Sequence, residues 1–156
     1  VLLIEADLHC PSLSGTLGIA RTSGLAECLE GNLDPLSAIR RLEPLQWYLL
    51  PAGQPVGNPT ELLQSNDFGN VVEKVSPYFD WILIDTPPVA PLSDALLAAK
   101  SADACLLVVR ANQTPKAAVD DALALLGPKH VAGIVFNAAE GLNHLYSKYS
   151  GYYGRK

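Results

Sequence analysis

The sequence has few cysteines, no methionine, no apolar run of bilayer length and no surplus of positive charge. Its cysteines, Cys10, Cys28 and Cys105, are odd in number and far apart, which fits neither a disulfide framework nor a paired zinc-ligand spacing. This pattern suits a reducing cytosol, and the short apolar runs argue against a membrane-spanning helix. With a net charge of -5 there is no basic surface, so we expect no direct nucleic-acid binding.

What is present describes one ordinary globular core. Of the 156 residues, 49% are hydrophobic and 17% are charged, which is enough to bury a single domain. The chain opens directly on the apolar run Val1 to Ile4. Because chain termini normally lie outside the sheet, we expect this strand to be preceded by a further segment in a longer protein.

Apolar runs of strand length alternate with stretches of helical periodicity. The runs are largely continuous rather than alternating in polarity, which is typical of parallel strands covered on both faces. The pattern predicts a doubly wound α/β fold with a mainly parallel sheet, in which ligands bind at the carboxyl ends of the strands. We predict strands over residues 1–6, 47–50, 81–85, 104–110 and 131–137, and helices over residues 23–30, 35–41, 60–64, 68–75, 93–100 and 115–126.

Carboxylates stand at the ends of two predicted strands. Glu5 and Asp7 end the first strand and, two residues apart, share one side of it, while Asp85 ends the strand that begins near Trp81. An acid at the end of a buried strand needs compensation, and Mg²⁺, which prefers oxygen ligands, is one source of it. The alternative is structural: Glu5 and Asp7 cap the following loop, and Asp85 accepts backbone N–H bonds.

The last eleven residues hold four of the six tyrosines, namely Tyr146, Tyr149, Tyr152 and Tyr153. Their neighbours are Ser, Gly, Lys and Arg, which cannot bury aromatic rings, so we expect an accessible tail. Such tyrosines can accept phosphate, provide stacking surfaces, or form a terminus without a function.

Four segments resemble one family, the bacterial tyrosine kinases of capsule and exopolysaccharide export, a branch of the MinD/ParA-like P-loop ATPases. Residues 1–12 (VLLIEADLHCPS) resemble its second Walker motif, and residues 79–88 (FDWILIDTPP) resemble its Walker B strand. The Pro-Ala-Gly of residues 51–53 and the Asn-Pro-Thr-Glu-Leu-Leu of residues 58–63 are similar to two further family segments. The tyrosine cluster is similar to the family's autophosphorylated tail. All four occur in the family's order.

The resemblance implies a kinase that binds ATP and Mg²⁺. In it, Asp7 and Asp85 arrange the metal and its waters around the phosphates, and Glu5 helps to orient or deprotonate the attacking tyrosine hydroxyl. Asn137 matches the position where MinD-like relatives contact adenine, and Arg110 ends the neighbouring predicted strand. The phosphate acceptors are Tyr146, Tyr149, Tyr152 and Tyr153.

The resemblance also implies an organisation and partners. Residues 1–140 form the kinase domain, starting at the second Walker motif, and residues 141–156 form a flexible tail. Family members assemble into homo-oligomeric rings in which the tail enters a neighbour's site in trans. They work with a transmembrane polysaccharide co-polymerase activator, fused upstream or separate, and with a protein-tyrosine phosphatase. We therefore expect a cytoplasmic protein at the inner face of the plasma membrane.

The sequence departs from the family pattern at three points. Glu5 stands where the family usually has Asp, and His9, followed by Cys10, stands where it usually has Arg. His9 could bind metal or transfer protons, although a lone loop histidine is more often a bystander. The phosphate loop Gly-x-x-x-x-Gly-Lys-Ser/Thr is absent from the sequence, so this chain alone should not bind ATP productively. We expect the parent protein to carry the loop upstream.

Two other functional classes stay open. One is a MinD/ParA-like ATPase that uses ATP for dimerisation and positioning, which would hydrolyse ATP without forming phosphotyrosine. The other is a non-catalytic regulator of polysaccharide export, suggested by the changed residues Glu5 and His9.

Overall fold

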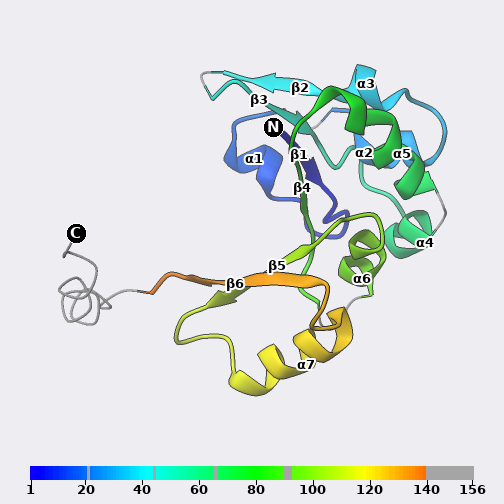
Figure 1. Ribbon diagram of the computed structural model, residues 1–156. Helices are drawn as coiled ribbons and strands as arrows, with labels where there is room; N and C mark the ends of the chain where they lie inside the picture. The colour runs from blue at the N-terminus through cyan, green and yellow to red at the C-terminus, as the bar shows by residue number, and fades with distance from the viewer. Residues whose placement is uncertain (21, 44, 65–66, 90–92, 140–156) are drawn as a thin grey trace. The chain divides into compact units, whose positions relative to one another are not determined.

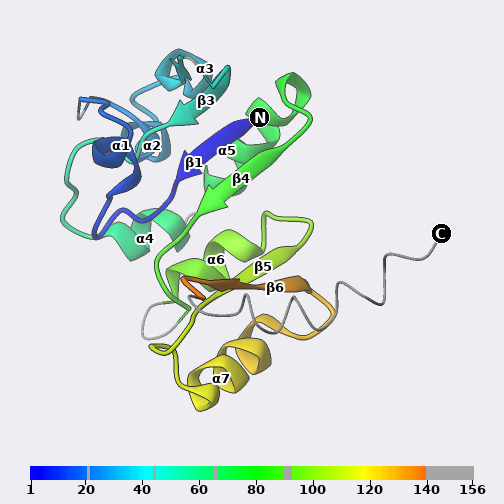
Figure 2. The ribbon, with the colours of Figure 1, turned by 90° about the vertical axis from the view of Figure 1, so that its left-hand side faces the viewer.

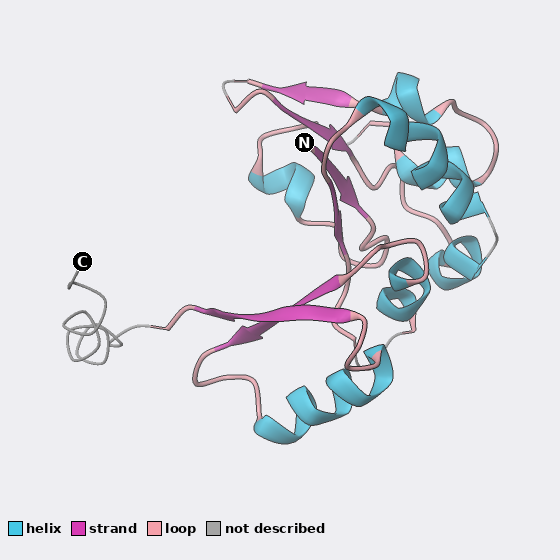
Figure 3. Ribbon diagram, in the orientation of Figure 1, coloured by secondary structure: helices cyan, strands magenta, loops and turns pink. Residues whose placement is uncertain are grey.

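The computed structural model describes residues 1–20, 22–43, 45–64, 67–89 and 93–139. The chain forms two compact units, of which the first runs from Val1 to Asp103 and the second begins at Ala104. Both units mix strands and helices along the chain, as the α/β prediction requires (Figure 3). The predicted boundary between residues 140 and 141 falls where the described residues end, so it stays a prediction.

A four-stranded sheet in the order β2-β3-β1-β4 forms the centre of the first unit (Figure 1). The strands are β1 (Leu2–Glu5), β2 (Arg40–Leu42), β3 (Trp47–Leu50) and β4 (Ile82–Asp85). β1 pairs in parallel with both β3 and β4, and Figure 2 shows it beside β4. The predicted parallel arrangement is confirmed for these three strands. They could be predicted because continuous apolar runs mark them in the sequence.

β2 was not predicted. It begins at Arg40, so the helix expected over residues 35–41 is wrong in its last residues. The helix α3 (Pro35–Ala38) begins as the sequence indicates, with Asp34 accepting a hydrogen bond from the Leu36 N–H at 2.8 Å. It ends early because Ile39 takes an extended conformation. The chain then pairs antiparallel with β3, so a tertiary contact overrides the local helical pattern.

Helices lie on both sides of this sheet, with α1 on one side and α2, α3 and α5 on the other (Figure 1). Four predicted helices of this unit besides α3 are confirmed within two residues at each end, whereas α1 and the short 3₁₀ helix were not predicted. The helices are α1 (Leu13–Thr16), α2 (Leu25–Leu29), α4 (Pro59–Gln64), α5 (Asp67–Val75), η1 (Ser76–Tyr78) and α6 (Asp94–Ala99).

The core of the first unit is centred on β1. Leu2 and Ile4 have no exposed surface, and they pack in one cluster with Leu25 of α2, Leu50 of β3 and Val75 of α5. The prediction of strands covered on both faces holds only in part for β1, because Leu3, on the face opposite Leu2 and Ile4, is half-buried. It is wrong for β4, where Leu83 is 45% exposed.

The Pro- and Gly-rich stretch after β3 is a loop, and it is held against the start of α2. The carbonyl of Pro51 accepts from Leu25 N–H at 2.7 Å, and that of Ala52 accepts from Ala26 N–H at 2.9 Å. Gly24 allows this approach, because a Cβ there would collide with the Pro51 backbone. The loop is thereby fixed beside the carboxyl end of β1.

The second unit contains β5 (Cys105–Arg110), α7 (Lys116–Leu126) and β6 (Val131–Asn137). β5 and β6 form a parallel pair, and all three elements match their predicted ranges closely. Apolar β5 residues are exposed here too, with Leu106 at 62%, so the expected cover on both faces is not found.

Within the described ranges of the whole chain, no helix has the length and apolar character needed to cross a membrane.

Candidate functional site

The carboxyl ends of β1 and β4 bring two of the predicted acids together. Glu5 and Asp85 are register partners on these neighbouring parallel strands. The ladder continues one residue further, because Ala6 N–H donates to the Asp85 carbonyl at 2.7 Å. The expectation that separate strands deliver acids to one edge of the sheet is confirmed.

Glu5 is fully buried, and its carboxylate is surrounded by donors. Oε1 accepts from Ser14 N–H at 3.1 Å, and Oε2 accepts from Ala52 N–H at 3.1 Å and from the Ser14 hydroxyl. Three hydrogen bonds compensate the cost of removing this charge from water. Glu5 therefore holds α1 and the loop after β3 at the end of β1. The sequence did not single out Ser14, because a serine in a short helix carries no distinguishing signal.

A pocket of about 320 Å³ lies beside this carboxylate. Its wall includes Glu5 and Ser14 together with Ile19, Thr22 and Gly53. Apolar and polar groups line it together, and the Thr22 hydroxyl is buried without a hydrogen-bond partner among the described residues. The pocket thus offers both an apolar surface and an unused polar group next to the strand end.

Asp7 lies two residues beyond the end of β1 and is held by the backbone of its own loop. Its Oδ1 accepts from the N–H groups of His9 at 3.1 Å and Cys10 at 2.9 Å. This turn fixes one carboxylate oxygen and leaves Oδ2 for a further ligand. The loop-capping alternative considered for Asp7 is therefore observed, and it remains compatible with metal binding through the second oxygen.

Asp85 is an acid whose pKa is raised by its surroundings. Although the residue is largely exposed, partial burial of its carboxyl group raises its pKa, and the negative charges of Glu5 and Asp7 raise it further. Within the described residues, the charges that act on the Asp85 carboxyl are those of Glu5 and Asp7, and both are negative. A hard dication would relieve this repulsion, and one or two carboxylates are what Mg²⁺ usually takes from a protein. The donor set at Asp7 and Asp85 therefore fits Mg²⁺. No cluster of three or more His, Cys, Asp or Glu side chains suited to a metal is found in the described part of the chain.

His9 is not a bystander in this structure. Its Nε2 lies 2.9 Å from Oδ2 of Asp94 and 3.4 Å from Oγ1 of Thr60, and the Thr60 hydroxyl donates to Oδ1 of Asp94 at 2.8 Å. Asp94 is buried in the first turn of α6, and Thr60 lies in the first turn of α4. We call these three residues the His9 cluster. Sequence reasoning missed Asp94, because an acid at a helix start usually serves the helix alone.

Comparison with known proteins shows the family of this chain. The chain is 33% identical over 159 residues to the tyrosine-protein kinase CpsD of Streptococcus agalactiae, covering 99% of this chain and 69% of the relative. It belongs to the bacterial tyrosine-protein kinases. Another CpsD, from serotype III of that species, is 35% identical over 78% of this chain, which covers 53% of the relative's length. No family model matches the chain.

Solved structures agree with this kinase family. The kinase domain of VpsO has a TM-score of 0.82 and 29% identity, over 88% of this chain and 70% of that domain. The septum site-determining protein MinD of Pyrococcus horikoshii, complexed with Mg-ADP, has a TM-score of 0.71 at 21% identity, over 89% of this chain and 59% of MinD. The latter shows the fold alone, which is the MinD-like P-loop fold expected from the sequence.

In this kinase-family chain, the predicted nucleotide residues lie in the second unit. Arg110 and Asn137 end β5 and β6 and are register partners. Asn137 Oδ1 accepts from Ala138 N–H at 2.8 Å, and the Arg110 N–H donates to the Thr114 hydroxyl at 3.1 Å. Both side chains are exposed at the carboxyl end of their strand pair. The tail tyrosines, Tyr146, Tyr149, Tyr152 and Tyr153, lie outside the described residues.

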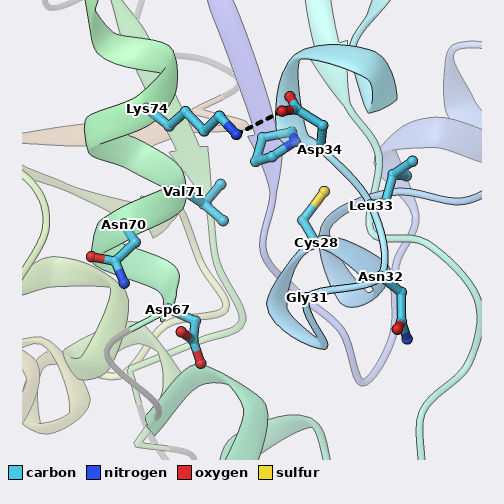
Figure 4. Close-up of a pocket in the computed structure, with 10 residues that line it drawn as sticks. Cys28, Gly31, Asn32, Leu33, Asp34, Asp67, Asn70, Val71 and Lys74 are labelled. Carbon is cyan, nitrogen blue, oxygen red and sulfur yellow. Dashed lines mark hydrogen bonds and ion pairs between the residues drawn. The ribbon is translucent and has the colours of Figure 1, made fainter.

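A second pocket of the first unit, of about 410 Å³, lies between α2, α3 and α5 and has a different character (Figure 4). The ion pair between Lys74 and Asp34, 2.6 Å long, spans one side of it. Burial, together with the charges of Glu27 and Asp34, raises the pKa of the Cys28 thiol to about 11, so this thiol stays protonated at neutral pH. The pocket therefore holds no activated thiol, and Lys74 balances the charge of its Asp34 carboxylate.

Proposed function

We propose that the protein is an autophosphorylating tyrosine kinase that transfers the γ-phosphate of ATP to tyrosines of its C-terminal tail. The observation that carries this proposal is the meeting of Asp7 and Asp85 with buried Glu5 at one edge of the sheet, in a chain of the tyrosine-protein kinase family. Phosphoryl transfer is largely positioning and charge neutralisation, which this arrangement suits.

Asp7 and Asp85 would hold Mg²⁺ and its waters. When bound, the metal would supply charge neutralisation for the phosphate oxygens. Asp85 would contribute a carboxylate whose pKa is raised by burial and by its acidic neighbours, so a cation would be favoured there. Asp7 would contribute Oδ2, since its Oδ1 is engaged by the loop backbone.

Glu5 would act on the acceptor side. The pocket beside it has an apolar wall that would receive a tyrosine ring, and the ring's hydroxyl would then lie near Glu5, which lines the same pocket. Because three donors already engage the carboxylate, Glu5 is better suited to orienting the acceptor and shaping the pocket than to removing its proton. Tyr146, Tyr149, Tyr152 and Tyr153 would be the acceptors.

The remaining roles concern the nucleotide, the assembly and the partners. A phosphate loop upstream of this chain would hold the β- and γ-phosphates, and Asn137 and Arg110 would contact the adenine end of ATP. The protein would assemble as a ring with the tail entering in trans, at the inner face of the plasma membrane. A transmembrane polysaccharide co-polymerase would activate it, a tyrosine phosphatase would reverse it, and the cycle would regulate exopolysaccharide chain length and export.

The test is phosphate mapping by mass spectrometry after the intact protein is incubated with ATP and Mg²⁺. Asp85→Asn is compared with Asp80→Asn, which makes the same change just before the amino end of β4. Tail phosphotyrosine that Asp85→Asn lowers at least about 100-fold, a loss of about 2.7 kcal/mol of transition-state stabilisation, and that Asp80→Asn preserves is the expected result.

Two outcomes would contradict the proposal. ATP turnover with an unmodified tail would identify the positioning ATPase instead, a class favoured by the fold shared with MinD. Neither turnover nor phosphotyrosine would leave the non-catalytic regulator.

A further inference from the structure

Asp94 is a buried carboxylate whose compensation depends on the His9 cluster. Its side chain has no exposed surface, and Oδ2 makes no other hydrogen bond within the described residues. A carboxylate held out of water without a donor is costly. Because the His9 ring nitrogen lies 2.9 Å from Oδ2, an Nε2–H supplies the missing donor. The pairing holds in either protonation state of the ring, since the Nε2–H tautomer and the imidazolium both donate there.

The same histidine contacts Asp7 through its main chain. His9 N–H donates to Asp7 Oδ1 at 3.1 Å, and the next amide, that of Cys10, donates to the same oxygen at 2.9 Å. The loop that bears these amides is exposed, with 31% of the His9 side chain accessible. Exposed loops fluctuate unless a side chain is anchored in the body of the protein. The His9 ring is such an anchor, because it reaches the starts of α4 and α6.

We propose that His9, anchored by Asp94 and Thr60, is a positioning residue for the Asp7 carboxylate. The path is continuous: buried Asp94 holds the ring, the ring fixes the loop backbone, and two loop amides fix Asp7 Oδ1 so that Oδ2 points to one place. The inference rests on the proposed function in one respect, namely that Asp7 is a ligand of Mg²⁺ or its waters. Mg²⁺ demands near-octahedral geometry, so a carboxylate free to rotate would bind it less tightly.

The test uses the intact protein and two readouts that need no catalysis. The first is amide hydrogen exchange at positions 9 and 10, followed by NMR. The second is the dissociation constant for Mn²⁺ alone, read from the EPR signal of the free ion. The variants are His9→Ala, His9→Gln and Asp94→Asn, with His130→Ala as the matched loss of an imidazole from the second unit. Thermal unfolding verifies that each variant is folded.

We expect His9→Ala to raise the exchange rate of both amides about tenfold, the effect of losing roughly one hydrogen bond. The Mn²⁺ dissociation constant should rise about tenfold, as is usual when a partner of a metal ligand is lost. His9→Gln should retain most of both properties, because its side-chain amide can still donate to Asp94. The double variant with Asp94→Asn should cost no more than His9→Ala alone, because Asp94 acts on the loop only through the His9 ring.

The inference would be overturned if the His9→Ala protein had the same amide exchange rates and the same Mn²⁺ affinity as the His130→Ala protein. Additive effects of His9→Ala and Asp94→Asn would overturn it as well. Asp7→Asn separates this failure from failure of the proposed function, because it keeps an oxygen for the two amides but removes the charge. If Asp7→Asn leaves Mn²⁺ affinity unchanged, the metal role of Asp7 is refuted, and with it the part of the inference that concerns metal.

Discussion

Replacing Glu5 by glutamine tests how far the site depends on a buried, fully hydrogen-bonded carboxylate. The substitution keeps the size of the side chain but exchanges one acceptor oxygen for an NH₂ group. In the better of its two orientations, the remaining oxygen accepts from Ala52 N–H and the Ser14 hydroxyl. The new NH₂ then faces Ser14 N–H, so two donors meet where a hydrogen bond existed.

The cost follows from the bonds that change. Losing one hydrogen bond to a charged group costs roughly 1.5–3 kcal/mol, and the two others weaken as their acceptor becomes neutral. Relief of the buried charge offsets part of this loss. We expect Glu5→Gln to lower the free energy of unfolding by about 2–3 kcal/mol, which in a chain of this length lowers Tm by roughly 5–10 °C.

The assay is thermal unfolding of Glu5→Gln beside Glu73→Gln, in which the same change is made at an exposed glutamate of α5. The control is expected to stay within about 0.5 kcal/mol of the natural protein. If Glu5→Gln and Glu73→Gln melt within about 1 °C of each other, the carboxylate does not hold α1 and the loop after β3, contrary to the contacts described above.

Two further predictions concern the loop after β3 and the charge at β4. Gly24→Ala is expected to destabilise the protein by about 1–3 kcal/mol, because its Cβ would meet the Pro51 backbone, whereas Gly15→Ala, with open space around its Cβ, should have little effect in the same denaturant titration. Equal effects of the two substitutions would contradict this packing. Asp85→Asn is expected to stabilise the metal-free protein at neutral pH. Because the folded-state pKa of Asp85 lies above its unfolded value, its contribution to stability is present at pH below about 4 and is lost as the pH rises through the folded pKa. The melting temperatures of Asp85→Asn and the natural protein should therefore converge as the pH falls, and a gap that widens toward acid would show that the sign is wrong.

The strands were predictable because their signal is local and strong. Continuous apolar runs marked β1, β3, β4, β5 and β6, and the observed bounds differ from the expected ones by a single residue at most. β2 was not predicted, since Arg40–Leu42 is short, has arginine at two of its three positions and is a strand only because β3 lies beside it. Thr114, which precedes Pro115 and α7, is a residue type that commonly caps helices, but its hydroxyl does not cap α7. Its hydroxyl accepts from Arg110 N–H instead, a competing local bond that composition does not reveal.

The sequence by itself determined the α/β class, the parallel pairing and the delivery of Glu5 and Asp85 to one sheet edge, because strand ends and side-chain alternation are properties of the local chain. Only the tertiary structure decided which groups the side chains around this edge contact. Glu5 bonds to Ala52, 47 residues away, and His9 approaches Thr60, 51 residues away, and the buried Asp94. Such partners are chosen by how the loops and helices pack over the sheet, and no spacing in the sequence encodes which donor will reach which oxygen.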